Sequence, residues 1–307
     1  MSPAPGQISI PARLAHTVTA EEGEAARSWL TSLPERVAAH LARWDLTLER
    51  VLEPGGRRSL IGYAHRDDLS AVALKATLPA PEPSREHAAL AHWAGRGAVL
   101  LLDSDPAEGV LLLERLHGEI PLRSLAEAKA MLEATSLLRR LWVPLTDGHG
   151  FTPLADHAAV LLSGLRRRCE LPAAADARPL ADAALEAAEV LLSSATEQFL
   201  LHGNFHHGKV LAADRAPWLA VAPEPLAGER AYDLARLAQD RIDTLVASPG
   251  PRGAARRRLQ QLAEAVEVDH DRLRGWTLLR SVDTGLRHLE AGDTGSAELY
   301  LEFADWL

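Results

Sequence analysis

The sequence contains a single cysteine, Cys169, so it has neither a disulfide framework nor a thiolate zinc site. It lacks a run of about 18 apolar residues, which disfavours a helix that crosses a membrane. Its first residues, MSPAPGQISIPARL, do not show the charged-then-apolar pattern of a signal peptide. These absences predict a cytoplasmic protein with no membrane partner.

The chain also lacks any long block of like charges, and its formal net charge is −9. The one basic run, Arg256–Arg258, lies among Ala, Leu and Gln, which is typical of a solvated helix face. A nucleic-acid partner is therefore disfavoured, because such proteins carry a basic patch or stripe. The length of 307 residues favours two domains or two lobes, and the hydrophobic content of 47% is sufficient for ordinary cores.

The beginning of the chain is predicted to be helical. Apolar residues such as Leu30, Val37 and Trp44 recur at helical spacing over residues 20–44, with Pro34 starting a second segment. Such a stripe indicates core packing rather than contact with a cofactor.

The period then changes to that of strands. Three short runs separated by turns predict a three-stranded antiparallel meander, and two later runs predict a hairpin. The predicted strands are Leu46–Leu52, Ser59–Tyr63, Ala71–Thr77, Ala98–Leu102 and Gly109–Leu116. A proline-rich turn at Pro79–Pro83 and a helix that starts at Ser84 separate the third strand from the fourth.

Most of the remaining chain is predicted to be helical. Ser124 and Glu127 have the spacing of a capping box, and the helix they would start runs to about Leu141. Further helices are predicted at 154–169, 177–196, 230–246, 254–266, 269–290 and 294–306. The pattern predicts an α+β protein with a small strand-rich lobe (residues 1–116) and a large helical lobe (residues 117–307).

One non-helical stretch interrupts the second lobe. Three short apolar runs, Gln198–Leu201, Lys209–Ala212 and Trp218–Val221, flank a loop that contains two glycines and three histidines. Loops held between short strands commonly carry catalytic residues.

This loop resembles the catalytic loop of the aminoglycoside phosphotransferases, which reads H-G-D-x-H-x-G-N-[VI]-L. The sequence here is HGNFHHGKVL. Other segments in the same order, including EHAALAHWAGRGAVLLLDSD and WLAVAPEPLAGERAYDLA, are similar to the streptomycin 6-phosphotransferase and hydroxyurea phosphotransferase family. The resemblance implies a bilobal protein-kinase-like fold, with a five-stranded antiparallel N-lobe, one main helix in it, and a nucleotide in the cleft between the lobes.

The resemblance also implies a nucleotide-binding set in the first lobe. Lys75, the only charge in the run AVALKATL, and Glu86 match the family's lysine–glutamate pair. The alternative for Lys75 is an edge-strand lysine that points to solvent. Further predicted nucleotide contacts are Arg57, Arg58, Glu114 and Leu116.

Three positions of the family's catalytic site carry different residues in this chain. The catalytic aspartate falls on Asn204, the metal-binding asparagine on Lys209 and the metal-binding aspartate on Ala222. An amide cannot accept a proton at neutral pH, and an ammonium has no acceptor for a cation. The formal charge of the three positions changes from −2 to +1, so no metal is expected and any nucleotide is predicted to bind without Mg²⁺.

Neighbouring residues leave alternatives open. His206 could replace the missing base, and Glu224 could rescue a metal site, although a solvated turn glutamate is the simpler interpretation. The spacing of His202 and His206 occurs in some zinc sites, but structural roles are favoured. Asp233 is predicted to cap a helix or brace the loop. Carboxylates that could line an acceptor pocket for a cationic sugar are Asp240, Asp243, Asp269, Asp271, Asp283 and Glu290.

The sequence therefore predicts a pseudokinase that binds a nucleotide, a small molecule or a protein partner. One alternative is an active small-molecule phosphotransferase of antibiotic resistance or secondary metabolism with a rearranged site. Another is a different transfer chemistry on the same fold, such as nucleotidyl transfer.

Overall fold

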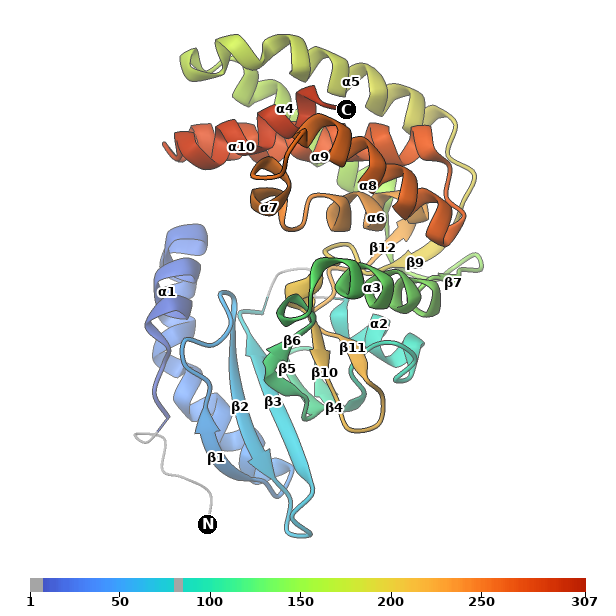
Figure 1. Cartoon of the computed structure of the whole chain (residues 1–307). Coiled ribbons are helices and arrows are strands. Elements are labelled where there is room, and N and C mark those ends of the chain that lie inside the picture. Colours follow the sequence, from blue (N-terminus) through green and yellow to red (C-terminus); the bar gives the residue numbers. More distant parts are fainter. Residues whose placement is uncertain (1–7, 80–84) are drawn as a thin grey trace. The chain divides into compact units, whose positions relative to one another are not determined.

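A computed structural model describes residues 8–79 and 85–307, which divide into two compact units (Figure 1). The first unit contains residues up to Glu119 together with Leu211–Leu219, and the second contains Ile120–Val210 and Ala220–Leu307. Most of the predicted turn Pro79–Pro83 and the predicted helix start at Ser84 lie outside the described residues. None of the described helices combines the length and apolar character that a bilayer span requires.

The first unit begins with the long helix α1 (Ala12–Arg43). The prediction that Pro34 starts a new segment is wrong, because Pro34 lies inside the helix and the break falls at Gly23, where φ is +57°. The apolar stripe Leu33, Val37 and Leu41 is fully buried on both sides of the proline position. Burial of this stripe outweighs the one backbone hydrogen bond that Pro34 cannot donate.

A five-stranded antiparallel sheet forms the rest of this unit, in the order β1-β2-β3-β5-β4. All five predicted strands are present, with boundaries shifted by a few residues: β1 Thr47–Val51, β2 Ser59–His65, β3 Ala71–Thr77, β4 Leu101–Asp105 and β5 Val110–Glu114. The hairpin β4–β5 joins the meander through β5, so β3 is the central strand. Helix α2 (Glu86–Trp93) follows β3 in the chain.

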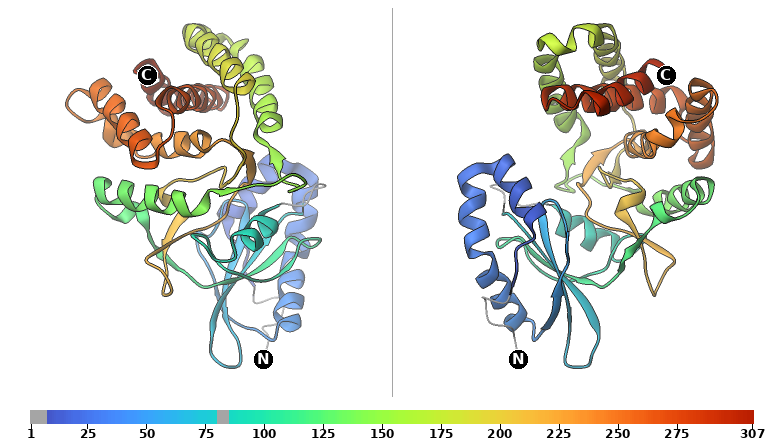
Figure 2. Two further views of the ribbon diagram at one scale, coloured as in Figure 1. Left: turned by 90° about the vertical axis from the view of Figure 1, so that its right-hand side faces the viewer. Right: turned by 60° about the vertical axis from the view of Figure 1, so that its left-hand side comes forward.

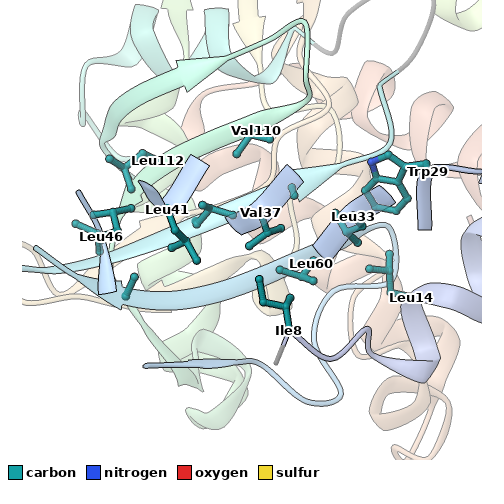
Figure 3. Close-up of a cluster of buried hydrophobic side chains, with 14 of the residues drawn as sticks. Ile8, Leu14, Trp29, Leu33, Val37, Leu41, Leu46, Leu60, Val110 and Leu112 are labelled. Atoms are coloured by element: carbon teal, nitrogen blue, oxygen red, sulfur yellow. The ribbon is translucent and has the colours of Figure 1, made fainter. Parts of the chain in front are cut away.

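The core of the first unit lies between α1 and one face of the sheet (Figures 2 and 3). Figure 3 shows Leu33, Val37 and Leu41 of α1 against Leu60 of β2 and Leu112 of β5. Alternating residues of these strands point to the same face, which explains why short strands suffice to bury the helix.

Three short strands lie where the chain passes from one unit to the other. These strands, β6 His117–Pro121, β10 Val210–Ala212 and β11 Trp218–Ala220, pair in the order β11-β10-β6. The turn between β10 and β11 belongs to the first unit.

The second unit is mostly helical. Its helices are α3 Glu127–Leu141, α4 Leu154–Cys169, α5 Arg178–Ser193, α6 Arg230–Ala238, α7 Ile242–Val246, α8 Pro251–Val266, α9 His270–Glu290 and α10 Thr294–Asp305, with short 3₁₀ turns η2 Leu122–Ser124, η3 Pro172–Ala177 and η4 His207–Lys209. The predicted helix 230–246 is two helices, because Arg241 has a left-handed φ of +55° between them. Helix α9 packs against α10, α5 and α6.

Two predictions are wrong at Glu127. Ser124 lies in η2 and does not cap α3, whose N-cap is Ala126 without a side-chain hydrogen bond. The Glu127 carboxylate instead pairs with Arg258 of α8. Arg258 is 7% exposed and donates to the carbonyls of Ala238 and Asp240, so the run Arg256–Arg258 is not a fully solvated face.

A small four-stranded sheet lies at the base of these helices. Its order is β7-β9-β12-β8, with β7 Val143–Pro144, β8 Thr152–Pro153, β9 Phe199–Leu201 and β12 Leu226–Gly228. β9 and β12 pair antiparallel, Leu201 opposite Leu226. This pairing fixes the start of the histidine-rich loop, which begins directly after β9.

Candidate active site

Lys75 occupies the centre of the sheet in the first unit. It lies in β3, opposite Ile61 of β2 and Leu111 of β5, and it is 7% exposed. The alternative of a solvated edge-strand lysine is therefore wrong. Its Nζ lies 2.6 and 2.7 Å from the two carboxylate oxygens of Glu86, the first residue of α2. A buried ammonium needs such a partner, and the pair fixes the position of Nζ.

Two further predicted nucleotide contacts, Glu114 and Leu116, have partners inside the same unit. The Glu114 carboxylate accepts hydrogen bonds from the Arg215 guanidinium at 2.7 to 3.0 Å and from the backbone N–H of Leu100 at 2.6 Å. Leu116 is buried, and its carbonyl accepts a hydrogen bond from the Tyr63 hydroxyl. These contacts stabilise the segment after β5, and a role of either residue toward a nucleotide stays a prediction.

Arg57 and Arg58 are exposed in the segment before β2. The Arg58 guanidinium lies 3.3 and 3.4 Å from the carboxylates of Glu21 and Glu22 at the kink of α1. Exposed pairs of this kind contribute roughly 0–1 kcal/mol, so they leave Arg58 able to exchange partners. Phosphate contacts by these arginines also stay a prediction.

In the second unit, Asp233 holds the backbone of the histidine-rich loop. Its carboxylate accepts hydrogen bonds from the N–H of His202 at 2.8 Å, the N–H of Gly203 at 2.7 Å and Nε1 of Trp142 at 3.2 Å. Asp233 is fully buried, and burial raises the pKa of its carboxyl, while the three donors favour the charged form. Asp233 lies within α6, whose N-cap is Glu229, so it braces the loop and does not cap the helix.

The segment around Ala222 packs directly against this loop. The Glu224 N–H donates to the His202 carbonyl at 2.8 Å. Gly203 has a φ of +78°, and a Cβ there would lie 1.9 Å from the Glu224 carbonyl oxygen. Only glycine fits so close an approach at this φ. The two segments therefore form one rigid arrangement within the second unit.

His202 uses both of its ring nitrogens inside this arrangement. Nε2 donates to the Val221 carbonyl at 3.2 Å, and Nδ1 accepts from the Asn204 N–H at 3.4 Å. The ring is fully buried. In the described part of the chain, no three His, Cys, Asp or Glu side chains are grouped so that they could hold a metal ion. The arrangement thus gives His202 a structural role.

Asn204 lies beside the carboxylate of Glu224, a contact that the sequence does not predict. Its Nδ2 donates to Oε1 of Glu224 at 2.9 Å. Glu224 is exposed, as expected of a turn glutamate. Its carboxylate nevertheless accepts a hydrogen bond from Asn204, the residue that matches the family's catalytic aspartate. Asn204, Lys209 and Ala222 carry 0, +1 and 0 charges, so Glu224 changes the formal charge of the set from +1 to 0.

Lys209 and Ala222 occupy adjoining backbone positions. The Lys209 carbonyl accepts from the Val221 N–H at 2.9 Å, and Ala222 follows with a left-handed φ of +52°. Aspartate and asparagine tolerate this conformation better than alanine does. A magnesium ion requires oxygen ligands, whereas these two positions supply an ammonium and a methyl group. The residues present therefore do not fit a magnesium ion.

His206 is poorly suited to replace the missing base. Burial, and then the charge of Arg236, lowers the pKa of His206 to about 3, so the ring is neutral at neutral pH. Its Nδ1 accepts a hydrogen bond from the Gly208 N–H at 3.2 Å. A base with so low a pKa takes up a proton weakly.

The depressed pKa of His206 predicts acid sensitivity. Below the unfolded pKa of 6.5 and above about 3, only the unfolded chain binds this proton, so stability falls as the pH falls. Between about pH 7.5 and about pH 5, the wild type is expected to lose about 2 kcal/mol more than His206→Asn, whose Oδ1 can accept from Gly208. Urea unfolding at both pH values measures the difference, and equal losses would contradict it.

The acidic residues proposed for an acceptor pocket are largely engaged elsewhere. The Asp240 carboxylate lies 2.6 Å from Nδ1 of His207; burial opposes its ionisation, but the hydrogen bonds and charge of His207 lower the pKa of Asp240 well below its usual range. Asp283 accepts from Arg168 at 2.8 Å and from Arg287 at 2.7 Å.

The four other members of that acidic set are also accounted for. Glu290 pairs with Arg168 at 3.1 Å, Asp269 caps α9, and Asp271 and Asp243 are exposed. Residues that the sequence interpretation missed lie nearby: Tyr232 and Arg236 of α6 and Arg280 of α9. No motif marks them, and only the helical spacing of Tyr232 and Arg236 places those two on one face.

The fold matches that of solved phosphotransferase structures. Spectinomycin phosphotransferase in complex with ADP and spectinomycin matches with a TM-score of 0.62 at 12% identity, covering 89% of this chain and 98% of that one. An aminoglycoside phosphotransferase in ternary complex with AMP-PNP and hygromycin B matches with a TM-score of 0.60 at 15% identity, covering 90% and 97%. The predicted protein-kinase-like fold is confirmed.

A sequence model of the aminoglycoside/hydroxyurea antibiotic resistance kinases matches residues 43–292. Streptomycin 6-kinase of Streptomyces glaucescens is 35% identical over 93% of this chain and 92% of its own length. Hydroxyurea phosphotransferase of Kitasatospora aureofaciens is 36% identical over 98% and 86%. The chain belongs to the aminoglycoside/hydroxyurea antibiotic resistance kinase family, as the sequence predicted.

Proposed function

We propose that this member of the family is a pseudokinase, which binds a nucleotide or another small molecule without Mg²⁺ and does not transfer a phosphoryl group. One observation carries the proposal. Asp233 braces the loop through two backbone hydrogen bonds, while Asn204, Lys209 and Ala222 offer neither a base nor a magnesium site.

The chemistry explains why these three positions matter together. Phosphoryl transfer relies on positioning and on neutralising the charge of the phosphates, to which bound metal ions contribute strongly. Loss of a positioned base alone typically costs about 10²- to 10⁴-fold in rate. The ammonium of Lys209 is a fixed positive charge where the family places a metal ligand, so it repels Mg²⁺ but can attract an anion.

In the first unit, the proposed anion contact is Lys75. Its ammonium has three donors, and Glu86 holds it in place through both carboxylate oxygens. The pair therefore supports binding of a phosphate group independently of the degenerate loop. Binding of a protein partner has no such contact to support it.

A second candidate is an active phosphotransferase that uses Glu224, and the 2.9 Å contact between Glu224 and Asn204 favours it. In this candidate the Glu224 carboxylate replaces the missing aspartate as base, and Asn204 orients it. The amide, the ammonium and the methyl group still leave magnesium with a single carboxylate, which is why we prefer the pseudokinase.

Calorimetric titration of the full chain with ATP, with and without Mg²⁺, tests the proposal. We expect equal affinities in the two titrations, weaker binding in Lys209→Asn because an attractive charge is removed, and no turnover of streptomycin or hydroxyurea. Stronger binding with Mg²⁺, or turnover that Glu224→Gln abolishes, would establish the second candidate. Absence of ATP binding in both titrations would overturn the nucleotide part of the proposal.

A further inference from the structure

Two arginines on facing helices of the second unit come together at Tyr232. The guanidinium of Arg280 in α9 lies over the Tyr232 ring of α6, 4.4 Å from its centroid. Arg236 follows Tyr232 by four residues, which places both side chains on the same face of α6. Helices α6 and α9 pack against each other, and the charge of Arg280 acts on Arg236, so the two guanidinium groups lie near one another. We call these two residues the arginine pair.

The pair lacks the anionic partners that other arginines of this unit have. No hydrogen bond or ion pair joins Arg236 or Arg280 to any residue that the structure describes, and Nη1 of Arg280 is buried without a partner. The buried or half-buried arginines that do have carboxylate partners are Arg168, Arg230, Arg258 and Arg272. Arg241 is also half-buried without a carboxylate partner, but its Nη2 donates to the carbonyls of Arg123 and Leu125. Among the described residues, Arg236 and Arg280 have neither kind of acceptor.

The groups around the pair do not neutralise it. His157 shares a 2.9 Å hydrogen bond with the Tyr232 hydroxyl, and burial followed by the charge of Arg280 lowers the pKa of His157. Burial, and then the charge of Arg280, also lowers the pKa of Arg236, whereas Tyr300, Asp240 and Glu224 act in the opposite direction. Glu224 is not within ion-pair distance of either arginine, and it already accepts from Asn204. Arg236 therefore lies near the loop, and neither arginine has a carboxylate within ion-pair distance among the described residues.

A cation held away from water without an acceptor is costly, and a bound anion is one explanation for such a group in a native structure. Guanidinium groups match oxyanions in shape, because their N–H donors form a planar fork. Two positive charges favour a dianion such as a phosphate monoester over a carboxylate. They also disfavour a cationic aminoglycoside at the same place.

We propose that Arg236 of α6 and Arg280 of α9 bind the phosphate group of a small phosphorylated molecule. This inference shares with the proposed function only the binding of a small molecule, here by the second unit. Binding at the arginine pair requires neither ATP nor Mg²⁺. The ligand class is a phosphate monoester, in contrast to the cationic or neutral compounds named for the relatives.

Titration of the full chain with inorganic phosphate and, separately, with acetate tests this proposal. We expect saturable phosphate binding, a rise of the melting temperature with phosphate, and acetate binding at least about tenfold weaker. Arg236→Gln and Arg280→Gln should each weaken phosphate binding about tenfold or more. Arg274→Gln, which removes the same charge from an exposed position of α9, should change it less than about twofold.

Stability without phosphate distinguishes a ligand site from a structural role. Because each variant removes one of two half-buried positive charges that repel each other, we expect both to melt no lower than the wild type in phosphate-free buffer. The proposal would be overturned if Arg236→Gln and Arg280→Gln bound phosphate as tightly as the wild type. It would also be overturned if the wild type bound no phosphate. ATP titrations of the same variants keep this result separate from the pseudokinase test, since the expected ATP affinity depends on Lys75 and Lys209.

Discussion

The triple variant Asn204→Asp, Lys209→Asn and Ala222→Asp is expected to bind ATP at least about tenfold more tightly with Mg²⁺ than without it, a dependence that the wild type should lack. The substitutions change the formal charge of these positions from +1 to −2. Two carboxylates and an amide supply the oxygen ligands that Mg²⁺ prefers. Calorimetric titration of both proteins measures the effect, and a tenfold change corresponds to about 1.4 kcal/mol.

The backbone already suits the restored residues. Ala222 has a φ of +52°, a left-handed conformation that aspartate adopts more readily than alanine. The loop is held by Asp233 and by the Glu224 N–H, neither of which depends on the substituted side chains. The variant should therefore fold as the wild type does, so a missing Mg²⁺ response would have a chemical cause.

Glu224 introduces the one conflict in this design. In the triple variant a carboxylate replaces the Asn204 amide that now donates to Glu224 at 2.9 Å, so two negative charges would meet without Mg²⁺. Because Glu224 is exposed, its side chain can turn toward solvent at small cost. Adding Glu224→Gln should leave the Mg²⁺ response in place if the three substituted positions create it.

A matched control separates charge from shape. The variant Asn204→Asp, Lys209→Asn and Ala222→Asn has the same backbone preference at residue 222 but one carboxylate fewer. It should show a clearly weaker Mg²⁺ response than the triple variant. If both respond equally, the aspartate at residue 222 is not a ligand, and if neither responds, more than three residues separate this chain from its active relatives.

The sequence predicted the positions of the five strands better than the contacts between segments that are distant in the chain. Lys75 was predicted in the third strand, but its burial depends on β5 pairing with β3, a contact between segments more than 30 residues apart. Pro34 predicted a helix start because proline fits a first turn, yet the apolar stripe of α1 continued through it. Local preference was overruled there by burial against the sheet.

The candidate site shows the same division. The loop and its three substituted positions were identified from residue type and order, because the family motif is local. The contact of Glu224 with Asn204 depends on the reversal of the chain at Ala222. Ala222 has a positive φ, which cannot be predicted from an alanine in the sequence. The arginine pair comes from two helices and has no ion pair to a described carboxylate, and residue spacing reveals neither property.

Replacement of Asp233 with alanine is expected to lower the free energy of unfolding by about 3–5 kcal/mol. The substitution leaves the N–H groups of His202 and Gly203 and the Trp142 indole without an acceptor in a fully buried place. Each unsatisfied buried donor typically costs about 1–3 kcal/mol. Urea unfolding measures the loss, and Asp243→Ala, an exposed position nearby, should change stability by less than about 0.5 kcal/mol.

Hydrogen exchange locates the effect of this substitution at the loop. In the wild type, the amides of His202 and Gly203 donate to the Asp233 carboxylate, so opening of the loop is needed before they exchange. In Asp233→Ala these two amides should exchange faster than they do in the wild type. The amides of β3 in the other unit lose no partner, so their exchange should not change. Asp233→Asn keeps one acceptor oxygen, so it should fall between wild type and alanine. Uniform acceleration across the chain would mean that Asp233 stabilises the fold as a whole, and no change at the loop would show that the Gly203–Glu224 approach alone holds it.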